Sequence, residues 1–242
     1  MRLFAVPFSY DESLLRETKP YRATVTYLRK VCQHNCLALL EGEPGVGKTF
    51  GALAYARRNN IPFITVVERV LLEKAPGRFF KAMVSEITGY EPTSLWDAID
   101  RLYEWASNGR QSSAIFLDEA QWLTGKALDV FRRLHDFTGL TIVFIGHQGE
   151  LSKLFARYPQ AADRVVFRFA VPHLSLEDIR TLHPDLDEEV RQSIYEMTNG
   201  NFRRVVRLMG YVHGYAQQKG ISLDRLTVSD VRAIAKLVVL GD

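Results

Sequence analysis

The stretch GEPGVGKT, residues 42–49, decides the fold class of this chain. It lies between an apolar run, residues 37–40, and a helix-like stretch that begins at Phe50. Its glycines let the backbone turn tightly and point N–H groups at phosphate oxygens. Lys48 can reach the β and γ phosphates, and the Thr49 hydroxyl can ligate Mg²⁺. We therefore expect a nucleoside triphosphate to bind the following residues: Gly42, Glu43, Pro44, Gly45, Val46, Gly47, Lys48, Thr49 and Phe50.

Short apolar runs that alternate with helical patterns predict a parallel sheet. They are rich in Val, Ile and Phe and do not alternate with polar residues, as expected of strands that helices cover on both faces. The runs are residues 37–41, 62–67, 114–118, 141–146 and 165–171. Between them, apolar residues at three-and-four spacing predict helices over residues 51–59, 78–88, 94–107 and 127–137. The first part of the chain is therefore an α/β domain with a five-stranded parallel sheet flanked by helices.

The pattern changes after Pro172, where only helical periodicity remains. Four segments are helix-like, residues 175–182, 187–198, 202–217 and 229–240, and the last three each carry an apolar stripe. Such segments form a small helical bundle. We expect an α/β nucleotide-binding core over residues 1–172, of which residues 1–20 are an N-terminal extension, and a helical lid over residues 173–242.

The run AIFLDE, residues 114–119, ends in two acids. A buried strand that ends in Asp-Glu is costly unless the two charges have partners. Asp118, at the carboxyl end of the strand, is placed to hold Mg²⁺ together with Thr49. Glu119 points elsewhere and is placed to polarise a water for in-line attack on the γ phosphate.

These motifs together resemble the AAA+ ATPases. The resemblance rests on the phosphate-binding loop, the strand ending in Asp-Glu-Ala-Gln, one further strand ending in a polar residue, and Gly-Asn-x-Arg in the lid. It extends from about residue 20 to the end of the chain and implies ATP with Mg²⁺. It also implies that the strand 141–146 lies between the other two motif strands and ends in a sensor side chain. His147 matches that position, and Gln148 is the alternative sensor. If neither acts as a sensor, His147 is a residue that caps the loop.

The resemblance also implies two arginines with catalytic roles. In the lid, Arg203 matches a second sensor that closes onto the nucleotide, with Arg204 as the alternative, and both arginines can instead face solvent. A planar guanidinium suits this role because it contacts phosphate oxygens in a fork. An arginine that acts on the neighbouring subunit is implied just before the fifth strand. Arg164 is the first choice and Arg157 the second, and an ion pair of Arg164 with Asp163 or Glu150 is the structural alternative.

Within that family, residues 114–151 are similar to the MuB and TnsC group of transposition regulators. Those proteins use ATP to assemble on DNA as rings or helical filaments, recruit a transposase and disassemble on hydrolysis. The similarity implies a homo-oligomer on double-stranded DNA, without sequence preference, and a transposase as partner. MuB carries an amino-terminal helix-turn-helix domain, whereas this sequence has only about twenty residues before its first predicted core helix, so the resemblance leads us to expect DNA contact from the ATPase core. The alternatives are a loader or remodeller of a replicative helicase or another protein, and a nucleotide-gated signalling or secretion-linked ATPase without DNA contact.

Net charge gives weak support to DNA binding, since it is only +3. Local basic spots can still build a binding face in a multimer, and two such spots are Lys74 with Arg78 and Lys81, and Arg132 with Arg133. Solvated surface charge is the default interpretation of both.

Two further observations concern location and metals. No run approaches the roughly 20 apolar residues of a membrane span, and the amino-terminal residues lack a secretory signature, so we expect a cytoplasmic protein without membrane contact. Cys32 and Cys36 lack the further ligands of a metal site and are expected to be buried thiols. Trp96, Trp105 and Trp122 are expected to pack in the core.

Overall fold

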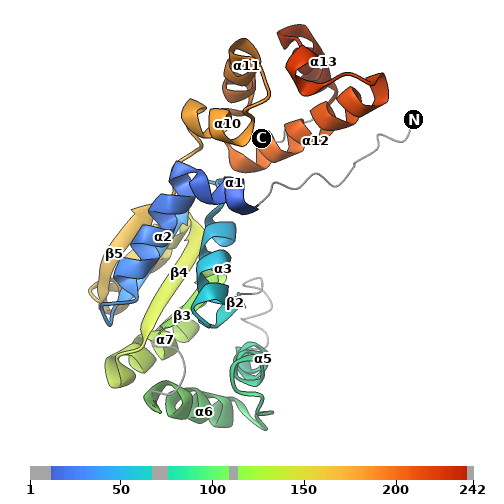
Figure 1. Cartoon of the computed structure of the whole chain (residues 1–242). Coiled ribbons are helices and arrows are strands. Elements are labelled where there is room, and N and C mark those ends of the chain that lie inside the picture. The colour runs from blue at the N-terminus through green and yellow to red at the C-terminus, as the bar shows by residue number, and fades with distance from the viewer. Residues whose placement is uncertain (1–11, 67–75, 109–113, 239–242) are drawn as a thin grey trace. The chain divides into compact units, whose positions relative to one another are not determined.

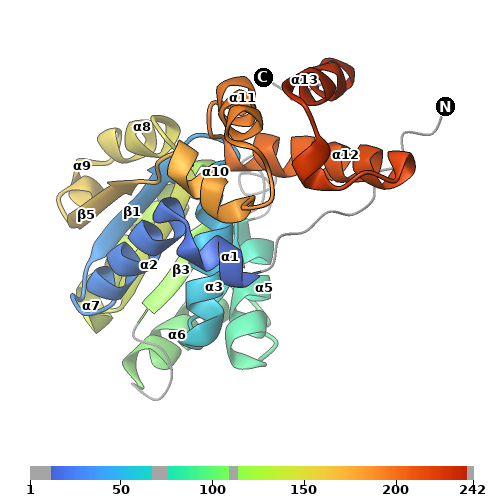
Figure 2. The same ribbon diagram turned by 45° about the horizontal axis from the view of Figure 1, so that its top comes forward.

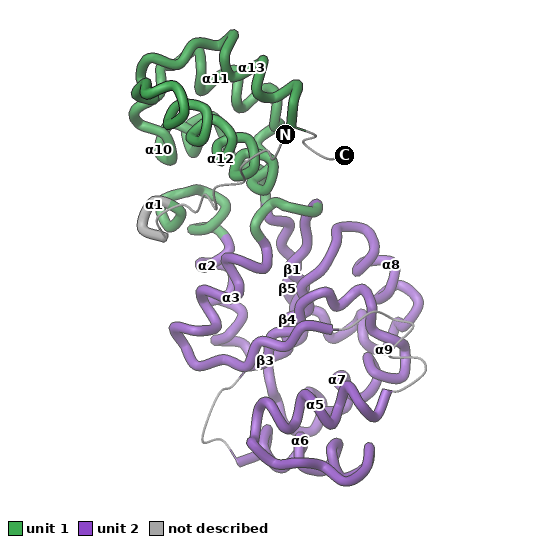
Figure 3. Tube along the Cα trace, turned by 90° about the vertical axis from the view of Figure 1, so that its right-hand side faces the viewer, with its two compact units in different colours: residues 1–23, 44–47, 172–242 green, residues 24–43, 48–171 purple. Residues whose placement is uncertain are grey.

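The computed structural model describes residues 12–66, 76–108 and 114–238. It divides into two compact units (Figure 3). The core unit comprises Thr24–Glu43 and Lys48–Val171. The lid unit comprises the residues up to Ala23, the loop residues Pro44–Gly47 and the residues from Pro172 onward. The middle of the phosphate-binding loop is therefore grouped with the lid helices.

The core unit is built on one five-stranded sheet with the strand order β2-β3-β4-β1-β5 (Figure 1). All four strand pairs are parallel. The strands are β1 (Leu37–Gly42), β2 (Phe63–Thr65), β3 (Ala114–Asp118), β4 (Thr141–His147) and β5 (Val165–Ala170). This confirms the predicted fold class, and the last residue of the predicted second strand, Val67, lies outside the described residues.

Helices cover both faces of the central strands β1, β3 and β4, which are buried along nearly their whole length, whereas the edge strand β5 alternates between half-buried and exposed residues. Alternate residues of β1, Leu37 and Leu39, belong to the main hydrophobic core, to which α5, α6, α7 and α8 contribute side chains. On the other face, the ring of Tyr55 in α3 stacks on Phe116 of β3 with ring centroids 6.2 Å apart. The helices are α2 (Lys19–Val31), α3 (Lys48–Arg58), α5 (Pro76–Thr88), α6 (Leu95–Ser107), α7 (Gly125–Thr138), α8 (Glu150–Ala156) and α9 (Pro159–Ala162), with a 3₁₀ turn, η1 (Ala120–Trp122).

The interpretation of the tryptophans as core residues is wrong for two of the three. Trp96 is 74% exposed and Trp122 is 40% exposed, whereas Trp105 packs against the core. In α6 the buried residues are Ala98 and Leu102, one turn apart, and Trp96 lies on the opposite side of the helix, which faces solvent whatever the residue type.

The lid unit contains four helices after residue 172, shown in orange to red in Figure 2. They are α10 (Leu176–Leu182), α11 (Glu188–Thr198), α12 (Phe202–Lys219) and α13 (Val228–Leu237). A 3₁₀ turn, η2 (Leu223–Arg225), lies between α12 and α13, and α1 (Glu12–Glu17) precedes all four in the chain. Ser175 and Thr227 each begin a helix with a capping box, which satisfies otherwise unpaired N–H groups. All four predicted lid helices are present, and the last two residues of the fourth prediction, 239 and 240, lie outside the described residues. Among the described residues, no helix has both the length and the apolarity needed to cross a bilayer.

Candidate nucleotide-binding site

The loop between β1 and α3 has the backbone that phosphate binding requires. Gly45 and Gly47 have φ angles of +83° and +98°, a region that side chains with a Cβ rarely occupy. Lys48, the first residue of α3, folds its side chain back over the loop. Its Nζ donates hydrogen bonds to the carbonyl oxygens of Gly42 and Glu43, both at 2.9 Å. The ammonium group is therefore held at the loop by main-chain acceptors.

Thr49 and Asp118 form the oxygen-rich pair that Mg²⁺ prefers. The Thr49 hydroxyl donates a hydrogen bond to Asp118 Oδ2 at 2.9 Å and keeps its lone pairs for a metal ion. Asp118 is only 4% exposed, and this burial raises the pKa of its carboxyl group, while the hydrogen bond from Thr49 opposes the rise. A bound cation would compensate the buried charge, so the two residues fit the metal role.

Glu119 leaves the strand in a different direction from Asp118. Its φ angle is +55°, which is unusual for a residue other than glycine and turns the chain from β3 into η1. The Glu119 side chain is 40% exposed, and its Oε2 lies 3.9 Å from His147 Nε2. The same oxygen accepts a hydrogen bond from Gln121 Nε2 at 2.5 Å.

His147 ends β4 beside the start of the phosphate-binding loop. In the parallel register between β1 and β4 it lies opposite Gly42. Its Nδ1 is 3.7 Å from Glu150 Oε2, and the backbone N–H of Gln148 donates to the Gly42 carbonyl at 3.1 Å. The core unit thus brings the predicted sensor residue and the predicted water-polarising residue together.

Within the lid unit, the start of α12 contacts the tip of the loop. Asn201 caps this helix and donates from Nδ2 to the Pro44 carbonyl at 2.8 Å, and the Arg203 N–H donates to the Gly45 carbonyl at 2.9 Å. A Cβ on Gly45 would lie 2.7 Å from Asn201 Oδ1 and 2.8 Å from Arg203 Cβ. Glycine at position 45 is therefore needed for this contact as well as for its backbone angle. Arg204 lies one position further along α12 and donates its N–H to Asn201 Oδ1 at 3.3 Å.

The two arginines considered for action in a neighbouring subunit differ in their surroundings. Arg164 Nε donates to Asp136 Oδ1 at 2.8 Å, and Nη1 donates to the Gln160 carbonyl at 2.9 Å. The hydrogen bond to Asp136 raises the pKa of Arg164. Its ion pair is formed with Asp136, and the nearby charge of Asp163 also raises the pKa of Arg164. Arg157, at the end of α8, is exposed and has no ion pair within the described part of the chain.

The two basic spots that could contribute to DNA contact differ in how their charges are paired. Arg132 and Arg133 both bind Asp129, and Arg132 also binds Asp136, so carboxylates compensate much of the charge of this spot and its role in DNA contact stays a prediction. Arg78 is exposed, and Lys81 Nζ donates to the Thr93 carbonyl at 3.3 Å. Lys74 lies outside the described residues.

Burial raises the pKa of Cys32 and of Cys36 to about 11. Cys36 is buried as expected, while Cys32 is half-buried. Neither thiol is a thiolate at neutral pH. Residues 12–66, 76–108 and 114–238 contain no cluster of three or more His, Cys, Asp or Glu that would hold a metal ion.

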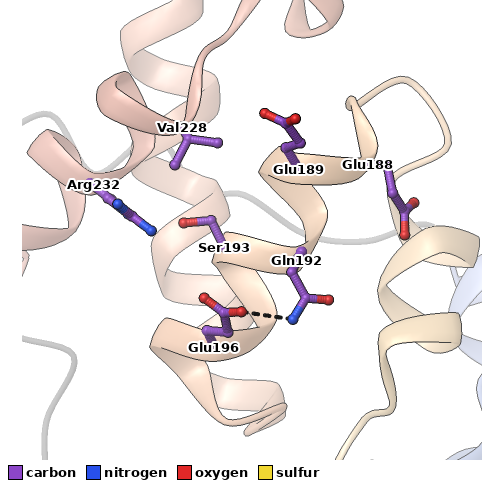
Figure 4. Close-up of a pocket in the computed structure, with 7 residues that line it drawn as sticks. All are labelled: Glu188, Glu189, Gln192, Ser193, Glu196, Val228 and Arg232. Carbon is purple, nitrogen blue, oxygen red and sulfur yellow. Dashed lines mark hydrogen bonds between the residues drawn. The ribbon is translucent and has the colours of Figure 1, made fainter.

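A separate pocket of about 500 Å³ lies in the lid unit between α11 and α13 (Figure 4). Three glutamates, Glu188, Glu189 and Glu196, line it with a single arginine, Arg232. This charge is wrong for a triphosphate, so the phosphate-binding loop remains the nucleotide site.

The sequence-based interpretation assigns no role to two residues whose side chains form hydrogen bonds in this site. Gln121 stands in the quoted Asp-Glu-Ala-Gln run, and Asn201 stands in the Gly-Asn-x-Arg motif. An Asn directly before an apolar helical stripe is an N-cap signal, so the position of Asn201 was visible in the sequence. The partner of Gln121 follows from the turn at Glu119, for which the sequence carries no signal.

Comparison with known proteins places this site in a family. A protein described as a potential ATP-binding protein from Staphylococcus aureus is 22% identical over 93% of this chain and 96% of its own length. The ORC2 protein of Aeropyrum pernix, solved with ADPNP and ADP, has 17% identity and a TM-score of 0.65, covering 98% of this chain and 71% of that one. The ORC1 protein of the same organism, solved in complex with DNA, has 18% identity and a TM-score of 0.60, covering 95% and 68%. The AAA domain family matches residues 32–155, slightly more than half of the sequence, and this chain belongs to that family.

Proposed function

We propose that this chain is a Mg²⁺-dependent ATPase that assembles on double-stranded DNA and regulates a transposase. The arrangement of Thr49, Asp118 and Glu119 carries the hydrolytic part of this proposal. Thr49 and Asp118 supply oxygen ligands for the metal ion. The carboxylate of Glu119 is partly exposed and lies on the turn after β3, away from these two ligands. In this scheme Lys48 neutralises phosphate charge, His147 senses the γ phosphate and Arg203 reaches the nucleotide from the lid.

The DNA-binding part rests on resemblance and on one neighbour. The similarity of residues 114–151 to MuB and TnsC supports target-DNA assembly and transposase recruitment, and the A. pernix ORC1 protein shares the fold and was solved with DNA. In such an assembly, an arginine from one subunit would complete the site of the next. The pairing of Arg164 with Asp136 favours Arg157 for this role.

Glu119→Gln tests the hydrolytic site. The amide keeps the shape of the side chain but cannot accept a proton, so the variant is expected to bind ATP normally and to hydrolyse it at least about a hundredfold more slowly. Equilibrium binding of ATP and phosphate release are the two measurements. Wild-type turnover in this variant would remove Glu119 from the mechanism.

DNA-dependent assembly is tested by negative-stain microscopy with linear double-stranded DNA and either ATP or a slowly hydrolysed analogue. We expect filaments or rings that require both nucleotide and DNA, persist longer for Glu119→Gln, and weaken steeply with added salt. Monomers under every condition would contradict the regulator function. A stoichiometric complex with a helicase, without assembly on DNA, would support the loader function instead.

A further inference from the structure

The side chain of Gln121 connects the end of β3 with the end of β4. It lies in η1, two residues after Glu119. Its Nε2 donates to Glu119 Oε2 at 2.5 Å, and its Oε1 accepts a hydrogen bond from the backbone N–H of His147 at 3.3 Å. A side-chain amide is suited to this double contact, because one end donates to a carboxylate while the other accepts from an N–H group.

Gly146 provides the space for this contact. A Cβ at position 146 would lie 2.5 Å from Gln121 Oε1, but 3.5 Å from both Gln121 N and Leu151 Cδ2. Only the first distance is too short, and it involves the far end of a flexible side chain. Gly146 is outside the residues with positive φ, so alanine is compatible with its backbone. The glycine therefore accommodates the Gln121 side chain rather than a special main-chain conformation.

We propose that Gln121 is a positioning residue for ATP hydrolysis. By holding Oε2 of Glu119, it fixes the rotamer of a side chain that is otherwise 40% exposed and leaves Oε1 as the oxygen presented to the attacking water. By accepting from His147 N–H, it ties this orientation to the strand end that carries the sensor position. The inference rests on the proposed hydrolytic function of Glu119.

Three variants test this role through phosphate release in the presence of Mg²⁺ and DNA. Gln121→Ala is expected to lower kcat about tenfold with KM unchanged, because ATP binding does not involve this side chain. Gly146→Ala pushes the amide aside and is expected to lower kcat to a similar extent while the melting temperature stays close to that of the wild type. The double variant Gln121→Ala/Gly146→Ala is expected to be no slower than Gln121→Ala alone, because the clash has been removed.

Gln121→Glu supplies a readout that a purely structural role would not change. The new carboxylate keeps the size of the side chain and still accepts from His147 N–H, but it has no N–H group to donate to Glu119 Oε2. We therefore expect kcat to fall about as far as in Gln121→Ala, with KM and the melting temperature unchanged. Wild-type turnover in this variant would overturn the proposal.

Glu119→Gln, measured in parallel, separates two kinds of failure. If Glu119→Gln is inactive while Gln121→Ala and Gly146→Ala turn over at the wild-type rate, the positioning role of Gln121 is wrong and the hydrolytic site stands. If Glu119→Gln itself turns over at the wild-type rate, the hydrolytic site is wrong. Additive losses in the double variant would also overturn the proposed link between Gly146 and Gln121.

Discussion

Replacement of Asn201 separates two contributions that this side chain makes to the lid unit. Its Oδ1 accepts the Arg204 N–H at 3.3 Å and caps α12, and its Nδ2 donates to the Pro44 carbonyl at 2.8 Å. An N-cap is worth about 1 kcal/mol. The second hydrogen bond is worth about 1 kcal/mol. Because Pro44 is exposed, water can solvate its carbonyl when the bond is lost, so no additional desolvation cost arises. Asn201→Ala is therefore expected to lower the free energy of unfolding by about 2 kcal/mol.

Asn201→Ser is the matched control, because serine caps a helix as well as asparagine but is too short to reach Pro44. We expect it to lose only about 1 kcal/mol. Urea denaturation followed by far-ultraviolet circular dichroism measures both variants. A serine variant as stable as the wild type would refute the contribution of the bond to Pro44. A serine variant as unstable as the alanine variant would refute the separate contribution of the cap.

Three other outcomes concern pH, metal and assembly. Burial, with the nearby charges of His213 and Arg191, lowers the pKa of His183 from 6.5 to about 3, so the unfolded state binds the proton first. The free energy of unfolding should therefore fall by about 1.4 kcal/mol per pH unit as the pH falls from 6.5 towards 3, and denaturation curves for His183→Asn should lack this slope. Chelation of Mg²⁺ should abolish phosphate release, and Asp118→Asn should need at least about tenfold more Mg²⁺ to restore it. Arg157→Ala should lower hydrolysis in the assembly about a thousandfold, and mixing it with Glu119→Gln protein should restore activity at shared interfaces; no recovery on mixing would exclude action in trans.

The strands and the loop were predictable because their signals are local. Strands buried on both faces are short continuous apolar runs, and the glycines of the loop specify a backbone that few other sequences adopt. Thr49 follows the loop after one strand, and Asp118 and Glu119 stand at the end of another. Because parallel strands end on the same side of a sheet, the sequence already indicates that these three residues lie near one edge.

Individual side-chain contacts and side-chain exposure were not predictable in this way. Arg164 pairs with Asp136, 28 positions away, whereas the expected partners were Asp163 and Glu150. The contact of Gln121 with Glu119 depends on the left-handed conformation at residue 119, and no sequence pattern specifies that conformation for a glutamate. Trp96 is exposed although tryptophan is hydrophobic, because burial in a helix depends on the angular position of a residue and not on its type alone.

The hydrogen bond from Arg203 N–H to the Gly45 carbonyl joins main-chain atoms on both sides. It therefore does not depend on which side chain occupies position 203, and any residue except proline can maintain it. Arg203→Ala thus removes a charge without detaching the helix, and a change in ATP affinity in that variant reports on the guanidinium alone. The side chain at position 203 can therefore change, by mutagenesis or in evolution, without loss of the hydrogen bond that attaches α12 to the loop.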